Sequence, residues 1–148
     1  MILRLILAFL VAVVVTAALA AAVSTQFVLA ELSQLGVEIG IGDRLAMTGH
    51  DMIGMGGTYL PVVGVGFLLA FGVAALVIRY LLPEWWLLGY TLAGFTAILA
   101  IILIMIAAFG LVPIAGARSV AGMLSQCLAG ALGGYLFARI LYGRRAIV

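Results

Sequence analysis

The residue types that support acid–base or metal chemistry are concentrated between Ser24 and Gly57. This stretch contains Glu31, Glu38, Asp43, Arg44, His50 and Asp51. The adjacent His50 and Asp51, with Asp43 and Glu38 nearby in the sequence, form the group that most resembles a metal or acid–base site. One histidine with carboxylates is not a specific metal pattern, and no His-x-x-x-His motif or cysteine pair accompanies it.

The geometry of a helix also argues against a shared site for His50 and Asp51. Neighbouring side chains on a helix point about 100° apart, so these two would not readily face one ligand. The alternative is a solvated loop in which Asp51 or Asp43 pairs with Arg44 or Arg118. We favour this alternative, and we expect neither a metal nor a cofactor.

Gln126 is the strongest polar candidate inside an apolar segment. It could contact a ligand or a lipid headgroup, or it could form an interhelical hydrogen bond, which is worth roughly 0.6–2 kcal/mol in membranes. We favour the interhelical bond. No Asp, Glu, Lys, Arg or His lies in the middle of an apolar segment, where proton relays and ion-coupled carriers usually need one. The sequence therefore argues against a pump and contains no catalytic constellation.

Sulfur-containing side chains offer a weaker candidate. Met47, Met52, Met55 and Met123 could suggest copper binding through thioethers. Methionine is also an ordinary filler of apolar packing, and no Met-x-x-Met repeat is present. Cys127 is the single cysteine, which excludes an internal disulfide. We expect it to be a small buried packing residue, because no carboxylate in a span could activate its thiol.

The composition indicates a membrane protein. The 148-residue chain is 68% hydrophobic and 8% charged, whereas soluble domains have roughly 45–50% apolar and about 25% charged residues. Lipid must therefore cover much of its surface. The net charge of +2 comes from arginines near the ends of apolar runs. This pattern is typical of topology control and not of a nucleic-acid surface.

Four apolar runs predict transmembrane helices at 3–23, 59–78, 87–109 and 120–142. A helix over the first run rises roughly 31 Å, enough to cross a hydrocarbon core of about 30 Å. A cleavable signal peptide is the alternative, since Ala18-Leu19-Ala20 looks like a small-residue cleavage site. The run is longer than a usual signal core, so we expect an uncleaved first span.

The segment 24–57 is predicted to be a partly helical loop. A short helix over Thr25–Leu35 would end at Gly36, which can adopt the left-handed conformation. Asp43 is expected to cap a second helix over Arg44–Met55. The apolar face of this helix would carry Leu45, Thr48, Met52 and Met55, and it would lie along the membrane surface or cap the bundle.

Glycine, proline and tryptophan mark the predicted ends of the spans. Gly54, Gly56 and Gly57 would form a flexible corner, and Pro61 would lie in the first turn of the second span. Trp85 and Trp86 fit the aromatic belt at lipid headgroups. Pro113 and Gly116 would break the chain between the third and fourth spans.

The fourth span has the clearest pattern, with two rows of small residues at intervals of four. The first row is Ala117, Ala121, Ser125, Ala129 and Gly133. The second row is Gly122, Gln126, Gly130, Gly134 and Ala138. Small residues at this spacing let helix backbones approach closely, so this helix is predicted to be the central packing element. Ala97, in the less patterned third span, is expected to face lipid.

The arginines predict the orientation through the positive-inside rule. With the N-terminus inside, Arg4, Arg79, Arg139, Arg144 and Arg145 are cytoplasmic. Arg44 and Arg118 then lie outside, as does the loop 24–57. Four spans place both termini in the cytoplasm, and we expect a plasma membrane, of the bacterial inner-membrane type.

The sequence thus predicts an all-α integral membrane protein, a single four-helix bundle with an extracytoplasmic loop between its first two spans. The leading hypothesis for its function is a non-catalytic accessory or scaffold subunit. Its partners would be the lipid bilayer and other membrane subunits, or further copies of itself. The alternative is a small transporter or a lipid- or quinone-binding protein with a cavity beneath the loop, and an intramembrane enzyme comes third.

Overall fold

The computed structural model describes residues 2–81, 83–110 and 115–143. Within these ranges the chain forms four long helices, α1 (Ile2–Gln34), α2 (Ile41–Tyr80), α3 (Trp86–Phe109) and α4 (Val120–Tyr142). Two 3₁₀ turns, η1 (Pro83–Trp85) and η2 (Ala115–Ala117), precede α3 and α4. All four long helices are apolar enough to cross a membrane, which confirms the predicted helical class and the four candidate spans. Pro113, Arg144 and Arg145 lie outside the described residues.

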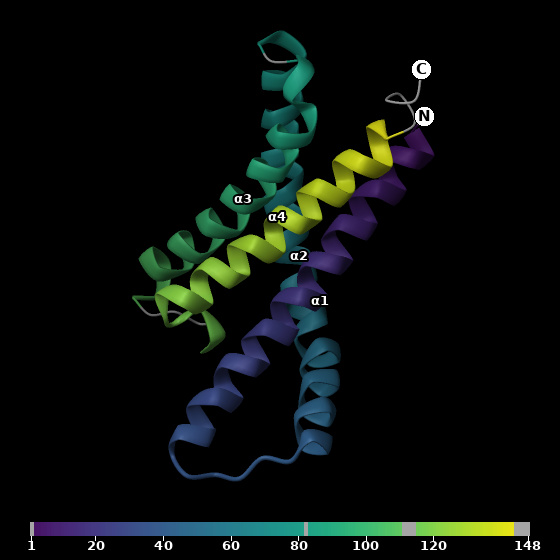
Figure 1. The fold of residues 1–148 in the computed structure, drawn as a ribbon. Coiled ribbons are helices and arrows are strands. Elements are labelled where there is room, and N and C mark those ends of the chain that lie inside the picture. The colour runs from purple at the N-terminus through teal and green to yellow at the C-terminus, as the bar shows by residue number, and fades with distance from the viewer. Residues whose placement is uncertain (1, 82, 111–114, 144–148) are drawn as a thin grey trace.

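Each long helix has two principal neighbours. Helix α4 packs against α3 and α1, α1 packs against α2, and α2 packs against α3 (Figure 1). The beginning of α1 lies beside the end of α4, where the Arg4 side chain donates a 2.6 Å hydrogen bond from Nε to the Ile140 carbonyl. We call this side of the bundle, which carries Arg4, Arg79 and Arg139, the arginine end.

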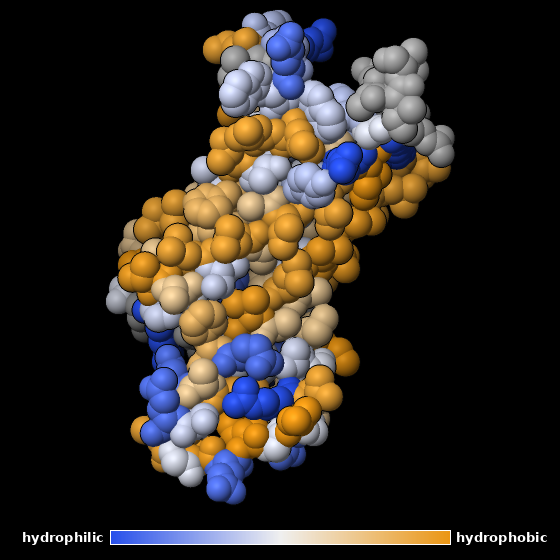
Figure 2. Space-filling view, in the orientation of Figure 1, coloured by the Kyte–Doolittle hydropathy of each residue, from blue (hydrophilic) through white to orange (hydrophobic). Residues whose placement is uncertain are grey.

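Helices α1 and α2 are longer than a membrane requires. Their 33 and 40 residues correspond to roughly 50 and 60 Å of helix, against a hydrocarbon core of about 30 Å. The excess forms a helical hairpin over residues 24–57, which extends beyond α3 and α4 (Figure 1). Hydrophilic side chains gather on this projecting hairpin, whereas apolar ones cover the middle of the molecule (Figure 2).

The hairpin corrects several local predictions. Gly36 does adopt a left-handed φ of 84°, just past the end of α1. The prediction that Asp43 caps the next helix is wrong, because the N-cap is the extended Gly40 and makes no side-chain cap bond. Asp43 instead lies in the first turn of α2, where a carboxylate still favours the positive end of the helix dipole.

The predicted corner at Gly54, Gly56 and Gly57 is also absent, since α2 runs through it without interruption. Gly54 and Gly57 are exposed there, and the intrinsic cost of a glycine inside a helix, about 1 kcal/mol, is too small to break a helix that continues on both sides. As a result Pro61 lies inside α2 and not in a first turn, as was predicted. Transmembrane helices tolerate proline because neighbouring groups re-satisfy the freed backbone carbonyl.

The ends of α3 and α4 follow ordinary capping rules. Helix α4 begins after Ser119, whose hydroxyl accepts a 3.0 Å hydrogen bond from the Gly122 N–H. Helix α3 ends at Gly110, a left-handed residue with a φ of 67°. Trp85 is exposed, as the aromatic belt requires, but Trp86 turns inward and its ring centroid lies 5.4 Å from that of Tyr142.

An aromatic cluster fills the half of the bundle nearest the arginine end. Phe71 of α2 stacks on Phe137 of α4 with ring centroids 4.5 Å apart. Tyr90 of α3 meets both rings edge-on, at 5.7 and 5.0 Å. These buried rings join α2, α3 and α4 and hold the helices apart at the width of an aromatic side chain, whereas the small residues described below bring α4 close to its neighbours.

Candidate functional site

The closest helix contact in the bundle is formed by glycines of α3 and α4. A Cβ placed on Gly94 would overlap the backbone of Gly130, and one placed on Gly130 would overlap the backbone of Gly94. Gly134 lies equally close to the carbonyl of Tyr90. We call this contact the glycine seam. Every member of the second small-residue row on α4 is buried, and the seam occupies the middle of that row.

The first row on α4 does not form a continuous buried face. Ala129 and Gly133 are buried, and Gly133 lies against Thr16 and Ala12 of α1. Ala121 is exposed, and Ser125 is half-buried with its hydroxyl donating to the Ala121 carbonyl at 2.8 Å. Ala117, the first member of the row, is buried in η2, so the row is buried at both ends and interrupted at Ala121 and Ser125. Within α4, only Ala129 and Gly133 are buried members of this row.

Gln126 makes the interhelical hydrogen bond that we favoured. Its Nε2 donates to the Ala20 carbonyl of α1 at 2.9 Å, and only 1% of the residue is exposed. Its Oε1 has no hydrogen-bond partner among the described residues. Nearby, the Thr16 hydroxyl donates to the Ala129 carbonyl at 3.4 Å. These two bonds join α1 to α4.

Tyr59 of α2 is a buried polar residue that the sequence analysis did not single out. Its hydroxyl is buried and has no hydrogen-bond partner within the described part of the chain. An unpartnered hydroxyl in an apolar interior costs about 1–3 kcal/mol. No pattern in the sequence pointed to this residue, because a tyrosine at the start of a span normally suggests the membrane interface.

The polar residues of the projecting hairpin hold its two helices together. The Thr25 hydroxyl lies 2.8 Å from Asp51 Oδ2, and it is also 3.0 Å from the Ala21 carbonyl. Gln26 Nε2 donates to the Thr48 hydroxyl oxygen at 3.1 Å. Asp51 therefore has a threonine partner in place of the arginine that we expected. The contact is structural and connects α1 to α2.

The hairpin does not assemble a metal or acid–base site from the predicted residues. His50 and Asp43 are exposed, whereas Asp51 is half-buried against Thr25. Arg118 is exposed in the turn between η2 and α4. Within the described ranges, no three or more His, Cys, Asp or Glu side chains are grouped so that they could hold a metal ion. Cys127 is fully buried in the apolar core.

A groove between α2 and α3 is a feature that the sequence analysis missed. It has a volume of about 620 Å³ and opens to the surface. Small residues at intervals of four line both of its walls. These are Gly66, Ala70 and Ala74 on α2, and Gly89, Ala93 and Ala97 on α3. We call it the α2–α3 groove. This spacing of small residues is visible in the sequence of α2 and α3, as it is in α4, but the sequence analysis considered it only for α4.

Two isoleucines keep the groove open. The Ile101 Cδ1 atom occupies the space beside Gly66, 2.6 Å from where a Cβ would lie. Ile78 does the same at Gly89, with its Cδ1 at 2.8 Å. Because each glycine accommodates a side chain and not a backbone, α2 and α3 stay apart between these two points. The expectation that Ala97 faces lipid is wrong, since it is only 5% exposed on the groove wall.

The lining of the groove is almost entirely apolar. Its single hydroxyl belongs to Thr96 and bonds the Leu92 carbonyl of its own helix at 2.9 Å. Leu69, Val73 and Leu92 stand on the rim and are more than half exposed. Such a groove offers van der Waals contact and no directional polar contact. Comparison with known proteins finds no matching family model, no curated relative and no similar solved structure.

Proposed function

We propose that this chain is a non-catalytic accessory subunit that receives a membrane-spanning helix of another protein in the α2–α3 groove. The observation that carries the proposal is the open groove itself, with small residues along both walls. Helices associate in lipid through close van der Waals packing, and small residues are the usual means of close approach. A third helix laid between α2 and α3 would find such residues on both sides.

The length of the groove supports a helix as its occupant. Its walls run from Gly66 to Ile78 on α2 and from Gly89 to Ile104 on α3. These segments correspond to roughly 18–22 Å of helix, about two thirds of a hydrocarbon core. A partner helix could therefore lie along most of its membrane-spanning length against this protein.

The absence of reactive groups favours an accessory role over chemistry or transport. In the sequence, no ionisable side chain of the Asp, Glu, Lys, Arg or His types lies in the middle of a span. Gln126 and Thr16 are engaged in bonds between α1 and α4. The polar contacts of the hairpin are also internal. What this protein presents to the membrane is shape and apolar surface.

We further propose that the arginine end faces the cytoplasm of a bacterial-type cell and that the hairpin lies outside. Arg4, Arg79 and Arg139 gather at one end of the bundle, whereas the hairpin carries Glu31, Glu38, Asp43 and Asp51. The positive-inside rule supports this orientation. Reporter tags should give a cytoplasmic signal at the C-terminus and an external one near Gly40, and a C-terminal reporter outside would refute it.

The rival function is a lipid- or quinone-binding protein in which the groove holds an acyl or isoprenoid chain. An apolar groove open to the bilayer supports this as well. The two proposals differ in what co-purifies. An accessory subunit retains a defined protein, whereas a lipid carrier retains a small amphiphile.

The test compares the parent chain with a variant whose groove is filled. Ala100 lies on the groove lining and is exposed, so Ala100→Phe adds bulk there without disturbing the buried core. Ala108→Phe, at an exposed position of α3 that is not on the lining, is the matched control. After purification in mild detergent, mass spectrometry should find a membrane protein that is lost with Ala100→Phe and kept with Ala108→Phe. Equal recovery from both variants would reject the groove as the docking site.

A further inference from the structure

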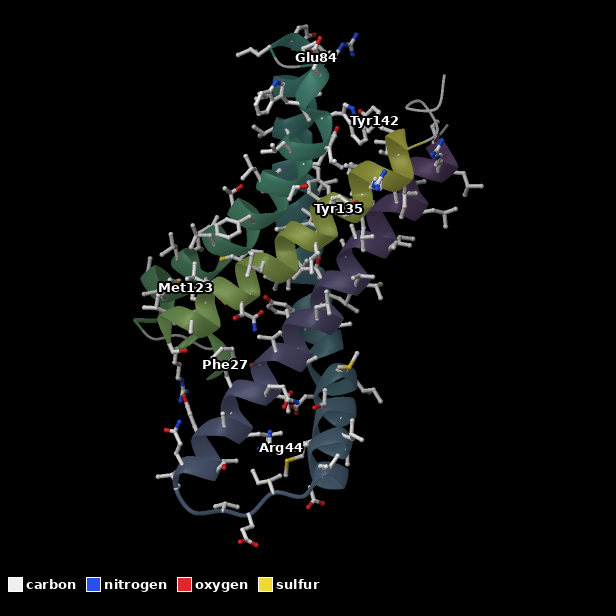
Figure 3. The ribbon with its side chains drawn as sticks, in the orientation of Figure 1. Phe27, Arg44, Glu84, Met123, Tyr135 and Tyr142 are labelled. Atoms are coloured by element: carbon white, nitrogen blue, oxygen red, sulfur yellow. The ribbon has the colours of Figure 1, made fainter. Side chains whose placement is uncertain are left out.

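A second pocket lies at the arginine end, between the start of α3 and the last turns of α4. It has a volume of about 430 Å³ and is lined by Glu84, Trp85, Leu87, Leu88, Thr91 and Tyr135. Glu84 and Trp85 belong to η1, outside the apolar body of α3, whereas Thr91 and Tyr135 lie deeper. Figure 3 labels Glu84, near the top of the view before α3, and Tyr135, on α4. We call it the interfacial pocket.

The end of the interfacial pocket formed by η1 carries two groups that favour cations, a carboxylate and an indole. Glu84 is the only acidic residue in the sequence outside positions 31–51, and it lies at the end of the bundle where arginines gather. Next to it, 57% of Trp85 is exposed. An indole face and a carboxylate both favour a positively charged group, and the two together form the usual environment of a bound ammonium.

The end of the pocket at Tyr135 carries a hydrogen-bond donor suited to an anion. Arg139 Nε donates to the Tyr135 hydroxyl oxygen at 2.9 Å, and the guanidinium carbon lies 5.5 Å from the centre of the Tyr135 ring. Because the Tyr135 oxygen accepts this bond, its own proton can be donated to another group. A hydroxyl polarised by a guanidinium is a good donor to an anionic oxygen.

The remaining lining is suited to hydrocarbon. Leu87 and Leu88 contribute apolar surface between the two ends. The Thr91 hydroxyl donates its proton to the Leu87 carbonyl at 2.7 Å, so it has no proton left to donate to a ligand. The carboxylate and the indole thus lie at the end of the pocket formed by η1. The polarised hydroxyl lies at the other end, and the leucines lie alongside.

We propose that the interfacial pocket binds an amine-bearing phospholipid of the phosphatidylethanolamine type. Its ammonium lies against Glu84 and Trp85, its phosphate faces the Tyr135 hydroxyl beside Arg139, and the first part of its chains covers Leu87 and Leu88. The order of charges in the pocket matches the order in the lipid, in which the amine is outermost and the phosphate lies between it and the acyl chains. This site is separate from the α2–α3 groove and does not depend on the function proposed for it.

The test is a lipid titration of the purified, delipidated full chain in detergent, read by native mass spectrometry. The probes are palmitoyl-oleoyl phosphatidylethanolamine and the phosphatidylglycerol with the same chains. We expect the ethanolamine lipid to bind about tenfold more tightly. Glu84→Gln should abolish this preference, whereas Glu38→Gln, an exposed acid in the hairpin loop, should keep it. Circular dichroism establishes that both variants retain the helical fold.

Three outcomes would overturn the proposal. The first is equal binding of the two lipids by the parent chain. The second is an unchanged preference in Glu84→Gln. The third is competition by soluble glycerophosphoethanolamine at the concentration of the lipid, which would identify a free headgroup compound and not a membrane lipid as the ligand. None of these three outcomes affects the groove test above, because that test uses other residues.

Discussion

The glycine seam and the α2–α3 groove use the same kind of residue to opposite effect. At the seam, Gly94 and Gly130 bring two backbones into direct contact. Along the groove, Gly66 and Gly89 each receive an isoleucine side chain from the facing helix. Both helix pairs carry small residues at intervals of four, yet one is closed and the other is open.

The two helix pairs differ in what the facing helix presents to the small residue. Lipid supplies no hydrophobic force that would drive helices together, so the pair settles wherever atoms first make contact. At the seam the facing helix presents backbone, from Gly94 at Gly130 and from Tyr90 at Gly134, and the Ile98 side chain lies beside this contact. At the groove, Gly66 and Gly89 each meet an isoleucine side chain and no backbone, and two such contacts leave a groove between the helices.

The largest expected effect follows from placing a leucine in the seam. Gly130→Leu should destabilise the bundle by about 2–3 kcal/mol or more, because the new Cβ meets the backbone of Gly94 and neither helix can give way. Gly134→Leu should behave alike against Tyr90. Unfolding in SDS or by heat in detergent measures the loss. The control is Ala108→Leu, at an exposed position of α3. Ala97, which we expected to face lipid, is buried and would not serve.

A smaller effect is expected for the bond between α1 and α4. Gln126→Leu keeps most of the side-chain volume but removes the donor to the Ala20 carbonyl. We expect a loss of about 1 kcal/mol, within the range measured for hydrogen bonds between membrane helices. The same unfolding assay reads it. A loss as large as that of Gly130→Leu would show that polar contact, and not close backbone packing, holds α4 in place.

The hydrogen bond between Thr25 and Asp51 in the hairpin should contribute a similar free energy of unfolding. It is measured as the interaction energy between the two residues. Thr25→Val and Asp51→Ala each remove one side of the 2.8 Å hydrogen bond. A double-mutant cycle should give an interaction energy of about 1 kcal/mol. The paired controls are Gln26 and Thr48, a more exposed contact from which a smaller coupling is expected. Full additivity of Thr25→Val and Asp51→Ala would mean that this hydrogen bond does not stabilise the hairpin.

The smallest effect is expected at the groove, and it sharpens the comparison most. Gly66→Leu makes the same change as Gly130→Leu, so the gain in helix propensity is alike for both. At Gly66 the obstacle is the tip of the Ile101 side chain, which can move, and open space lies beyond it. We expect the unfolding free energy to change by less than about 1 kcal/mol. A loss comparable to that of Gly130→Leu would mean that the groove is closed in solution.

The sequence predicted the helices better than their contacts. The bounds of the span over Val120–Tyr142 were predicted correctly from the apolar run, and the structure adds Ser119 as the cap of this helix. The continuity of α2 through Gly54 and Gly57 was missed, because clustered glycines were interpreted as a corner although each costs a helix only about 1 kcal/mol. The groove was missed for a related reason. Its small residues are visible in the sequence, but which residue faces each glycine is settled only by the register of α2 against α3.

The candidate site residues divide in the same way. Gln126 could be interpreted from the sequence, because a lone amide in an apolar helix must find a partner. The partner of Asp51 could not, since Thr25 lies in a different helix and carries no charge that would suggest the pair. Tyr59 gave no signal at all. Local chemistry was therefore predictable, whereas contacts between distant segments were not.

Site-specific photocrosslinking in native membranes would show whether the α2–α3 groove receives a helix of another protein. A benzophenone amino acid is placed at Leu92, on the groove rim, or at Leu124 of α4, positions with similar exposure of 53% and 49%. We expect one defined protein adduct from Leu92, absent when Ala100→Phe fills the groove, and none from Leu124. Adducts of equal yield at both positions, adducts only to lipid, or an adduct with the mass of two copies of this chain would contradict it.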